Sequence, residues 1–401
     1  MKYVIILADG MAGRPLDELG NQTTLQYAHT PVMDELAGKG MIGTVKTVPE
    51  GMKPGSDVAN LAVMGYDPAA FYSGRSPLEA LSVGVNMEDS DVVFRCNIVT
   101  LSEEEPYEEK TIIDHSSGEI STEDADILMD AIRQAFNTEE IQFYTGTSYR
   151  HITVWNHGKV LDMEAPHDHL GCKAGAYLPE HPLFRDMMER SFEILNNHPL
   201  NIQRAKEGKN KANSLWFWGA GVRPKLQNFR EKTGLSGGMI SAVDLLKGIA
   251  VGAGMKVIEV PGANGSLETN YIGKAHAAVN ALLQDDLDFV YIHVEAPDEM
   301  GHQGNPQNKI KAIENIDSKI VRIVKEQMDA SGEDYRMLIL PDHPTPICLR
   351  THTSEPVPYI LYDSRRQAKR IIHFNEQEAA AAGNYQPLGY KLLDTLIESE
   401  V

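Results

Sequence analysis

Runs of apolar residues predict buried strands along the chain, and helical spacing of apolar residues predicts helices between them. Apolar runs at 3–8 and 337–340, and the largely apolar stretch at 289–294, are typical of strands buried on both faces of a parallel sheet. Further strands are expected at 44–48, 92–99, 215–219 and 256–260, and helices at 58–64, 122–136, 183–195, 237–250 and 268–283. This alternation of strands and helices predicts a layered α/β fold with a mostly parallel sheet flanked by helices.

The pattern changes near Leu101. An acidic stretch is followed by the helix at 122–136, and 141–156 alternates between apolar and polar residues as two strands with one buried face do. We therefore expect a small inserted α+β domain at 101–179 and a main domain formed by 1–100 and 180–401. The insertion ends near His167 in a polar cluster, which is either a loop of the functional site or a hinge.

Residues that commonly bind metals follow the three buried strands. Asp298 and His302 are four residues apart, so their side chains point the same way on one helical turn. Ligands of parallel sheets bind beyond the carboxyl ends of the strands, where these residues are expected to meet. Six ligands suit two divalent metals, each with about three protein ligands. The six are Asp9, Asp298, His302, Asp342, His343 and His352.

Each part of this pattern also has a simpler interpretation. Asp342-His343 alone is equally typical of a strand-end turn with a capping carboxylate. Asp298 and His302 alone are equally typical of an exposed pair at the start of a helix. The metal interpretation is favoured because the residues follow three different strands of one sheet.

Ser56 is the candidate nucleophile. It precedes the helix at 58–64, where backbone N–H groups and the helix dipole favour an anion such as phosphate. A nearby metal lowers the pKa of a hydroxyl as it lowers that of water, so Ser56 between two metals would be activated. The alternative is a plain capping serine.

Composition narrows the classes of function. The chain has 401 residues, of which 42% are hydrophobic and 23% charged, and its formal net charge is −20. This charge argues against nucleic acid or membrane surfaces as partners, and no run reaches the roughly 20 apolar residues of a membrane span. Three separated cysteines and the short apolar run at the amino terminus favour a reducing cytoplasm without a signal peptide. Neither a P-loop nor a complete dinucleotide fingerprint is present.

The motifs together resemble the alkaline-phosphatase superfamily, and within it the archaeal type of 2,3-bisphosphoglycerate-independent phosphoglycerate mutase. The resemblance covers nearly the whole chain. It is carried by Asp9-Gly10, Lys53-Pro54-Gly55-Ser56-Asp57, Gly74-Arg75-Ser76-Pro77, Asp298-Glu299-Met300-Gly301-His302, Asp342-His343-Pro344-Thr345-Pro346 and His352-Thr353.

The resemblance implies an isomerase of glycolysis and gluconeogenesis that interconverts 3-phosphoglycerate and 2-phosphoglycerate through a phosphoserine at Ser56. It implies two divalent ions and no 2,3-bisphosphoglycerate cofactor. One ion would be held by Asp9, Ser56, Asp342 and His343, and the other by Asp298, His302 and His352. Manganese suits these mixed oxygen and nitrogen ligands best, and magnesium, zinc or cobalt remain open. The insertion would be a cap that excludes water from the phosphoenzyme.

The resemblance does not identify the cationic residues that bind the substrate, because the arginine motifs of larger family members are not found in this sequence. The residues expected to bind the substrate in their place are Lys53, Arg75, Arg95, Arg150 and Arg204. Each of them can instead form a structural ion pair. Two other functions stay open: a two-metal phosphatase or phosphotransferase acting on another small hydroxy acid, such as a homoserine-kinase-like enzyme, and a non-catalytic protein braced by metals. The oligomeric state is not predicted.

Overall fold

The chain folds into two compact units. The structure, a computed structural model, describes residues 1–366 and 370–398. The first unit consists of Met1–Tyr72 and Lys225–Val401, and the second, inserted unit is Ser73–Pro224. The insertion is therefore wider than the predicted 101–179. The reason is that the strand at 92–101 pairs with strands at 150–155 and 214–222, so both flanks of the predicted insertion belong to its own sheet.

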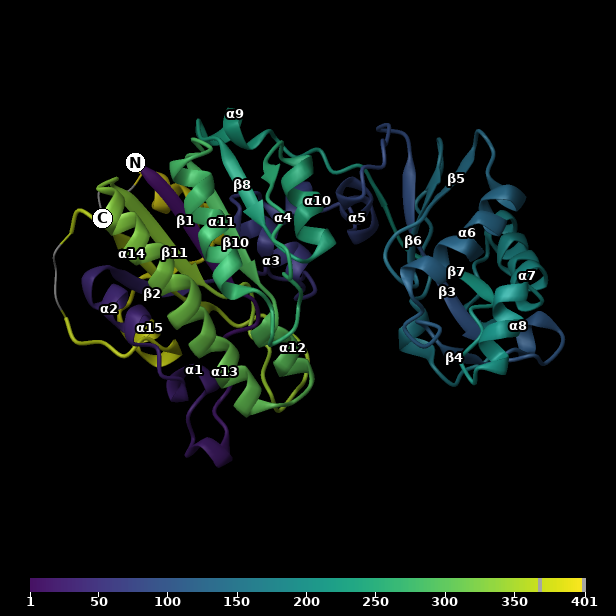
Figure 1. The fold of residues 1–401 in the computed structure, drawn as a ribbon, viewed down its shortest axis with the longest axis horizontal. Coiled ribbons are helices and arrows are strands. Elements are labelled where there is room, and N and C mark those ends of the chain that lie inside the picture. Colours follow the sequence, from purple (N-terminus) through teal and green to yellow (C-terminus); the bar gives the residue numbers. More distant parts are fainter. Residues whose placement is uncertain (367–369, 399–401) are drawn as a thin grey trace. The chain divides into compact units, whose positions relative to one another are not determined.

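An eight-stranded sheet forms the centre of the first unit (Figure 1). Its strand order is β13-β2-β12-β11-β1-β10-β8-β9, and only β12 runs antiparallel to its neighbours. The mostly parallel α/β layering expected from the sequence is thus confirmed. The strands are β1 (Lys2–Ala8), β2 (Met41–Val45), β8 (Gly237–Ile240), β9 (Lys256–Val257), β10 (Phe289–Val294), β11 (Tyr335–Leu340), β12 (Val357–Asp363) and β13 (Tyr385–Gln386).

Helices cover both faces of this sheet. Alternate residues of β1 contact opposite faces: Val4 and Ile6 belong to the core shared with α2, α11, α13 and α14, whereas Tyr3 bonds the end of α16 on the other face. The helices of this unit are α1 (Thr24–Tyr27), α2 (Pro31–Lys39), α3 (Ser56–Val63), α4 (Pro68–Phe71), α10 (Asp244–Gly252), α11 (Tyr271–Leu283), α12 (Ala296–His302), α13 (Pro306–Ile316), α14 (Arg322–Ser331), α15 (Glu376–Ala381) and α16 (Leu392–Glu398).

The three apolar runs chosen from the sequence are the three central strands. β1 lies between β11 and β10, and both pairings are parallel, so all three carboxyl ends lie at one edge. The helix expected at 237–250 is wrong in its first part, since Gly237–Ile240 is the strand β8 and the helix α10 begins only at Asp244. A four-residue apolar run carries no helical or strand period, so pattern alone does not separate the two.

The inserted unit is a five-stranded antiparallel sheet with helices on both faces. Apolar residues of α6 and α7 pack on one face, and Ala80 of α5 packs on Val93 and Ile152 on the other. Its elements are α5 (Arg75–Ser82), β3 (Val92–Leu101), β4 (Ile112–Asp114), α6 (Thr122–Phe136), β5 (Ile141–Tyr144), β6 (Arg150–Trp155), α7 (Pro182–Asn196), α8 (Pro199–Lys206) and β7 (Ser214–Val222), and α9 (Phe229–Thr233) follows in the first unit.

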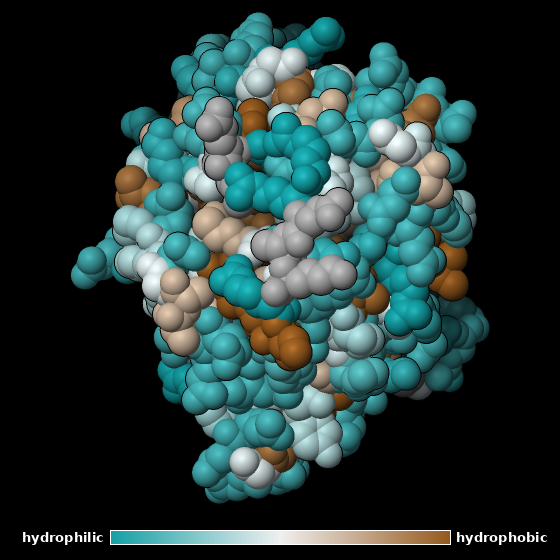
Figure 2. Space-filling view, turned by 90° about the vertical axis from the view of Figure 1, so that its left-hand side faces the viewer, coloured by the Kyte–Doolittle hydropathy of each residue, from teal (hydrophilic) through white to brown (hydrophobic). Residues whose placement is uncertain are grey.

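Hydrophilic residues dominate the face of the molecule shown in Figure 2, and its apolar residues are scattered. Among the described residues, no helix combines the length and the apolar composition that crossing a membrane requires.

Candidate active site

Asp9 is placed by the turn that ends β1. Its side chain is 2% exposed, and one carboxylate oxygen, Oδ1, has no hydrogen-bond partner among the described residues. Gly10 has a φ of +63°, and a Cβ there would lie 2.7 Å from the Asp298 Cα and 2.6 Å from the Thr345 Oγ1. Because a Cβ would clash with both residues, only glycine lets the turn after β1 come this close to Asp298 and Thr345.

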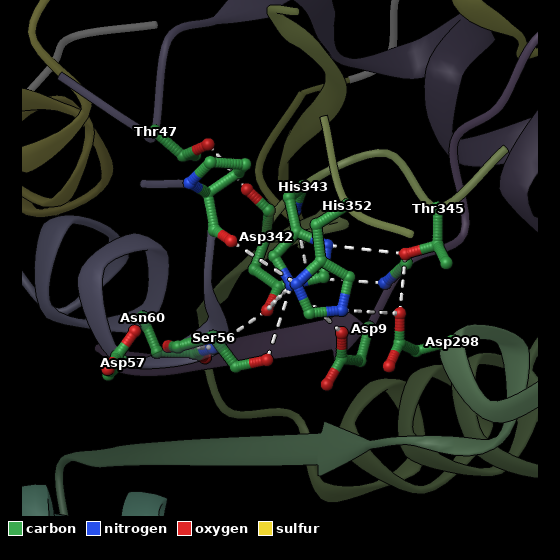
Figure 3. A network of polar contacts seen from close by, with 12 residues as sticks. Asp9, Thr47, Ser56, Asp57, Asn60, Asp298, Asp342, His343, Thr345 and His352 are labelled. Carbon is green, nitrogen blue, oxygen red and sulfur yellow. Dashed lines mark hydrogen bonds and ion pairs between the residues drawn. The ribbon is translucent and has the colours of Figure 1, made fainter. Parts of the chain in front are cut away.

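The loop after β11 supplies Asp342 and His343, both fully buried. Asp342 Oδ1 accepts from the backbone N–H of Gly10 at 3.1 Å, and Asp342 Oδ2 accepts from the Asn60 amide at 2.9 Å. The Thr47 hydroxyl donates to the Asp342 carbonyl oxygen. Gly10 and Asn60 thus hold the Asp342 carboxylate, and Thr47 holds its main chain (Figure 3).

Asp298, His302 and His352 form a second group. Asp298 and His302 lie on α12, with His302 Nε2 3.2 Å from Asp298 Oδ2, and His352 Nε2 lies 3.4 Å from Asp298 Oδ1. The two Nε2 atoms of His302 and His352 are 2.8 Å apart. The Thr345 hydroxyl also donates to Asp298 Oδ1. All three predicted ligands of the second ion are therefore adjacent.

His343 lies between the two groups. Ligand atoms of Asp9, Asp342 and His343 lie within 4.8 Å of one another, and so do those of Asp298, His343 and His352. The rings of His343 and His352 stack with centroids 3.9 Å apart. The sequence assigned His343 to the first ion alone, and the geometry places it within reach of both groups.

Ser56 faces this cluster as the first residue of α3. Gly55 occupies the cap position, and the Ser56 side chain accepts no bond from the helix backbone. Its Oγ lies 3.2 Å from His343 Nε2 instead. The geometry thus disfavours the capping alternative, because the hydroxyl points toward the candidate ligands (Figure 3).

The pKa values show that negative charge is crowded here. Burial, followed by the Asp342 and Asp298 carboxylates, raises the pKa of Asp9 well above its usual value. Burial opposes ionisation of Asp298 too, but hydrogen bonds with His302 and His352 hold its pKa well below the usual value. The pKa of His302 rises to about 9 through its bond with Asp298.

Divalent cations fit this donor set. Three buried carboxylates converge with three imidazoles, and Asp9 Oδ1 is buried without a partner. A bound cation would supply the missing partner and relieve the carboxylate repulsion. Carboxylate oxygens and imidazole nitrogens are both common ligands of divalent metals.

Several residues that the sequence analysis did not single out support the ligands. Asn60 binds Asp342, Thr345 binds Asp298, and His293 lies 2.9 Å from Asp9 Oδ2. Of these, only Asn60 had a usable signal, because it lies four residues after Ser56 and so shares its face of α3. In the sequence, nothing distinguishes His293 from the other residues of its buried strand.

The inserted unit gathers three of the predicted cations. Arg75 and Arg95 both pair with Glu79, at 2.7 and 3.1 Å, and Arg95 also lies over the Trp218 ring. Repulsion from Arg75 and Arg150 contributes, after burial, to lowering the pKa of Arg95 to about 10. The Arg150 guanidinium lies over Tyr149 and forms no ion pair within the described part of the chain.

Aromatic and imidazole rings surround this cationic cluster of Arg75, Arg95 and Arg150. His167 packs against Trp218 and His115, at centroid distances of 5.2 and 5.9 Å. The Nδ1 of His115 and the Nε of Arg95 are buried without hydrogen-bond partners among the described residues. His167 therefore belongs to this polar cluster, which favours the site interpretation of its loop over a hinge.

Arg204, the fourth predicted arginine, forms the structural ion pair that the sequence left open as its alternative. Its side chain is 5% exposed and donates to Asp124 at 2.7 Å and to the carbonyl oxygens of Ser117 and Asn210. Each of the three guanidinium nitrogens donates a bond within the inserted unit, which favours a structural role for Arg204 over anion binding. Lys53 is exposed on the loop before Ser56 and forms no hydrogen bond or ion pair with the described residues.

Known proteins resemble the chain over its whole length. Residues 37–201 match the family model of 2,3-bisphosphoglycerate-independent phosphoglycerate mutase. The enzyme of that name from Methanosarcina acetivorans is 48% identical over 96% of both chains. A probable mutase of the same kind from Geobacter sulfurreducens is 46% identical over 99% of this chain and 100% of its own.

Solved structures also resemble the chain over nearly its whole length. A protein of Pyrococcus horikoshii superimposes with a TM-score of 0.80 at 30% identity, covering 98% of this chain and 96% of its own. The cofactor-independent phosphoglycerate mutase of Thermoplasma acidophilum gives 0.67 at 26% identity, covering 99% of both chains. With relatives of this identity covering nearly the whole chain, the chain belongs to the family of 2,3-bisphosphoglycerate-independent phosphoglycerate mutases.

Proposed function

We propose that this chain interconverts 3-phosphoglycerate and 2-phosphoglycerate without 2,3-bisphosphoglycerate, using Ser56 as the nucleophile. One observation carries the proposal: the Ser56 hydroxyl, free of any capping bond, lies 3.2 Å from His343 at the centre of the candidate ligands. The family relationship supports the choice of reaction, because the relatives bear that enzyme's name.

Two divalent ions complete the site in this proposal. One ion would be held by Asp9, Asp342, His343 and Ser56, and the other would be held by Asp298, His302 and His352. His343 lies near both groups. When bound, the ions lower the pKa of the serine hydroxyl and offset charge on the phosphoryl oxygens. Manganese remains the preferred ion on the chemistry of the ligands.

The reaction then consists of two phosphoryl transfers. In the first, Ser56 Oγ gives up its proton and forms a bond to phosphorus, while the bond from phosphorus to the 3-oxygen of the substrate breaks and that oxygen gains a proton. Glycerate reorients while bound, and its 2-hydroxyl then takes the group from Ser56 by the same exchange. No water is consumed, so water must be excluded while the serine carries phosphate.

The cationic cluster of the inserted unit is proposed to bind an anionic group of the substrate. Arg150 is the strongest candidate, since it carries a positive charge without a carboxylate partner in the described chain, whereas Arg75 and Arg95 share Glu79. A guanidinium fits a carboxylate or phosphate through paired N–H donors.

Replacing Arg150 with methionine is expected to raise KM for 3-phosphoglycerate roughly 10- to 100-fold, the scale of a lost charge-assisted hydrogen bond. Arg204→Met is the matched control in the same unit. It should lower the free energy of unfolding, because Asp124 loses its buried partner, and leave KM unchanged. Steady-state kinetics and thermal unfolding of both variants check this. Equal KM values for Arg150→Met and the wild type would exclude Arg150 from substrate binding.

A coupled assay tests the function as a whole. Purified protein loaded with Mn²⁺ receives 3-phosphoglycerate, enolase detects 2-phosphoglycerate, and inorganic phosphate is measured in parallel. We expect isomerisation without added 2,3-bisphosphoglycerate to be much faster than phosphate release. Phosphate release without isomerisation would instead identify a phosphatase of the same architecture.

A further inference from the structure

A buried histidine outside the predicted ligand set holds the carboxylate of Asp9. His293 lies in β10, directly beside β1, where it pairs with Leu7 two residues before Asp9. Its side chain is fully buried, with Nε2 2.9 Å from Asp9 Oδ2 and Nδ1 3.2 Å from the Ser241 hydroxyl. Polar contacts thus connect Ser241, which follows β8, through His293 of β10 to Asp9, which follows β1.

The hydrogen-bond network fixes which ring nitrogen carries the proton. Asp9 Oδ2 is a carboxylate oxygen and only accepts, and the Ser241 hydroxyl, whose oxygen accepts from the Val243 backbone N–H at 3.0 Å, has its proton available for His293 Nδ1. Nδ1 is then an acceptor, and Nε2 carries the proton that it donates to Asp9 Oδ2.

The backbone at His293 is also held in place. Lys274 Nζ, on α11, donates to the His293 carbonyl oxygen at 2.8 Å, and Lys274 is itself fully buried. The imidazole is therefore fixed at both its ring and its main chain. A rigid donor of this kind determines the rotation of the carboxylate that it binds.

The two oxygens of Asp9 consequently have different environments. Oδ2 accepts the proton of His293, whereas Oδ1 has no partner among the described residues and lies 3.7 Å from His343 Nε2. The oxygen left free is the one that faces the group of Asp9, Asp342 and His343. If His293 were absent, the carboxylate would be free to rotate and to face the ligand group less often.

We propose that His293 is a positioning residue that orients Asp9 so that Oδ1 is its metal-binding atom, and that His293 thereby sets the ion affinity of the Asp9–Asp342–His343 group. This inference rests on the proposed function, because it requires that group to bind a divalent cation. It concerns one of the two ions only, since His293 contacts Asp9 and none of Asp298, His302 or His352.

The test measures Mn²⁺ binding directly. Metal-depleted wild-type protein and its variants are titrated with Mn²⁺, and free Mn²⁺ is followed by its electron paramagnetic resonance signal. His293→Leu removes the donor, and His293→Gln keeps an amide N–H near the position of Nε2. We expect the wild type to bind two ions, the leucine variant to bind one of them roughly 10- to 100-fold more weakly, and the glutamine variant to stay within a few-fold of wild type.

His151→Leu is the matched control. His151 is equally buried but lies on β6 of the inserted unit, where its Nδ1 accepts from the Gly146 backbone. This variant should bind both ions as the wild type does, which separates loss of the donor from the general cost of a buried leucine. If His293→Leu does not fold, His293→Asn replaces it, because its amide is too short to reach Asp9, and the same weakening is expected.

Two results would overturn the inference alone: binding of both ions with wild-type affinity by His293→Leu or its substitute, or equal losses in the glutamine and leucine variants, which would indicate packing rather than a hydrogen bond. Wild-type protein that binds no Mn²⁺ or other divalent ion would overturn the proposed metal site as well. The wild-type titration therefore distinguishes the two failures.

Discussion

Replacing Ser56 with alanine abolishes the interconversion of phosphoglycerates, lowering kcat by at least about 10⁴-fold, while the protein stays folded. The hydroxyl is the proposed acceptor of the phosphoryl group, and alanine offers no oxygen in its place. The loss of the hydroxyl should cost little stability, because the Ser56 side chain bonds no backbone group of its helix and its one hydrogen-bond partner among the described residues is His343. Coupled kinetics and thermal unfolding measure both quantities.

Ser121 provides the control for this substitution. It precedes α6 and caps it, with Oγ accepting from the Asp124 backbone N–H at 3.2 Å. Ser121→Ala should lower the free energy of unfolding by about 1 kcal/mol and leave kcat unchanged. The two serines should thus show opposite effects. Full activity in Ser56→Ala would mean that Ser56 is an ordinary helix-start serine and that the mechanism proposed here is wrong.

Asp298→Asn is expected to lower kcat by roughly 10³-fold or more, since a metal contributes several kcal/mol of transition-state stabilisation. Asp298 touches His302, His352 and Thr345, so an amide in its place keeps the shape of the site but removes the charge. The purified variant should retain about one Mn²⁺ fewer per chain than the wild type. Metal analysis after dialysis and steady-state kinetics check the two expectations together.

Asp34→Asn is the control for this substitution, because Asp34 is also a carboxylate that pairs with a histidine. Asp34 pairs with His373 at 2.9 Å, far along the chain from every candidate ligand, so Asp34→Asn also removes one member of an Asp–His pair. Its metal content and kcat should equal those of the wild type. If Asp298→Asn kept both its full metal content and its activity, Asp298 would not be a ligand, and the second ion would have to be placed elsewhere.

The sequence predicted the edge of the sheet where the ligands meet because the signals there are local. β1, β10 and β11 are largely apolar strands followed within four residues by Asp9, Asp298 and Asp342, and parallel neighbours bring such ends together. The topology predicts that the strand ends converge, whereas the grouping of Asp9, Asp342 and His343 around one ion came from the resemblance to the family. The position of His343 between both groups depends on side-chain rotation, which no pattern encodes.

Contacts between distant segments account for what the sequence did not predict. Arg204 is held by Asp124, eighty residues earlier in the chain, and nothing near Arg204 in sequence distinguishes a buried anchor from a substrate-binding arginine. The support of Asp9 by His293 joins residues 284 apart. The limits of the inserted unit were misplaced because β3 and β7, which begin and end outside the polar stretch, pair with each other across the insertion.

The most direct test of the central claim is to find the transferred phosphoryl group. Wild-type protein with Mn²⁺ is mixed with 3-phosphoglycerate, quenched in acid within milliseconds, digested and analysed by mass spectrometry. The account predicts one phosphoryl group on the peptide that contains Ser56, present with Mn²⁺ and absent after the metal is removed. Active conversion with no phosphate on Ser56 at any quench time, or with phosphate on another residue, would contradict it.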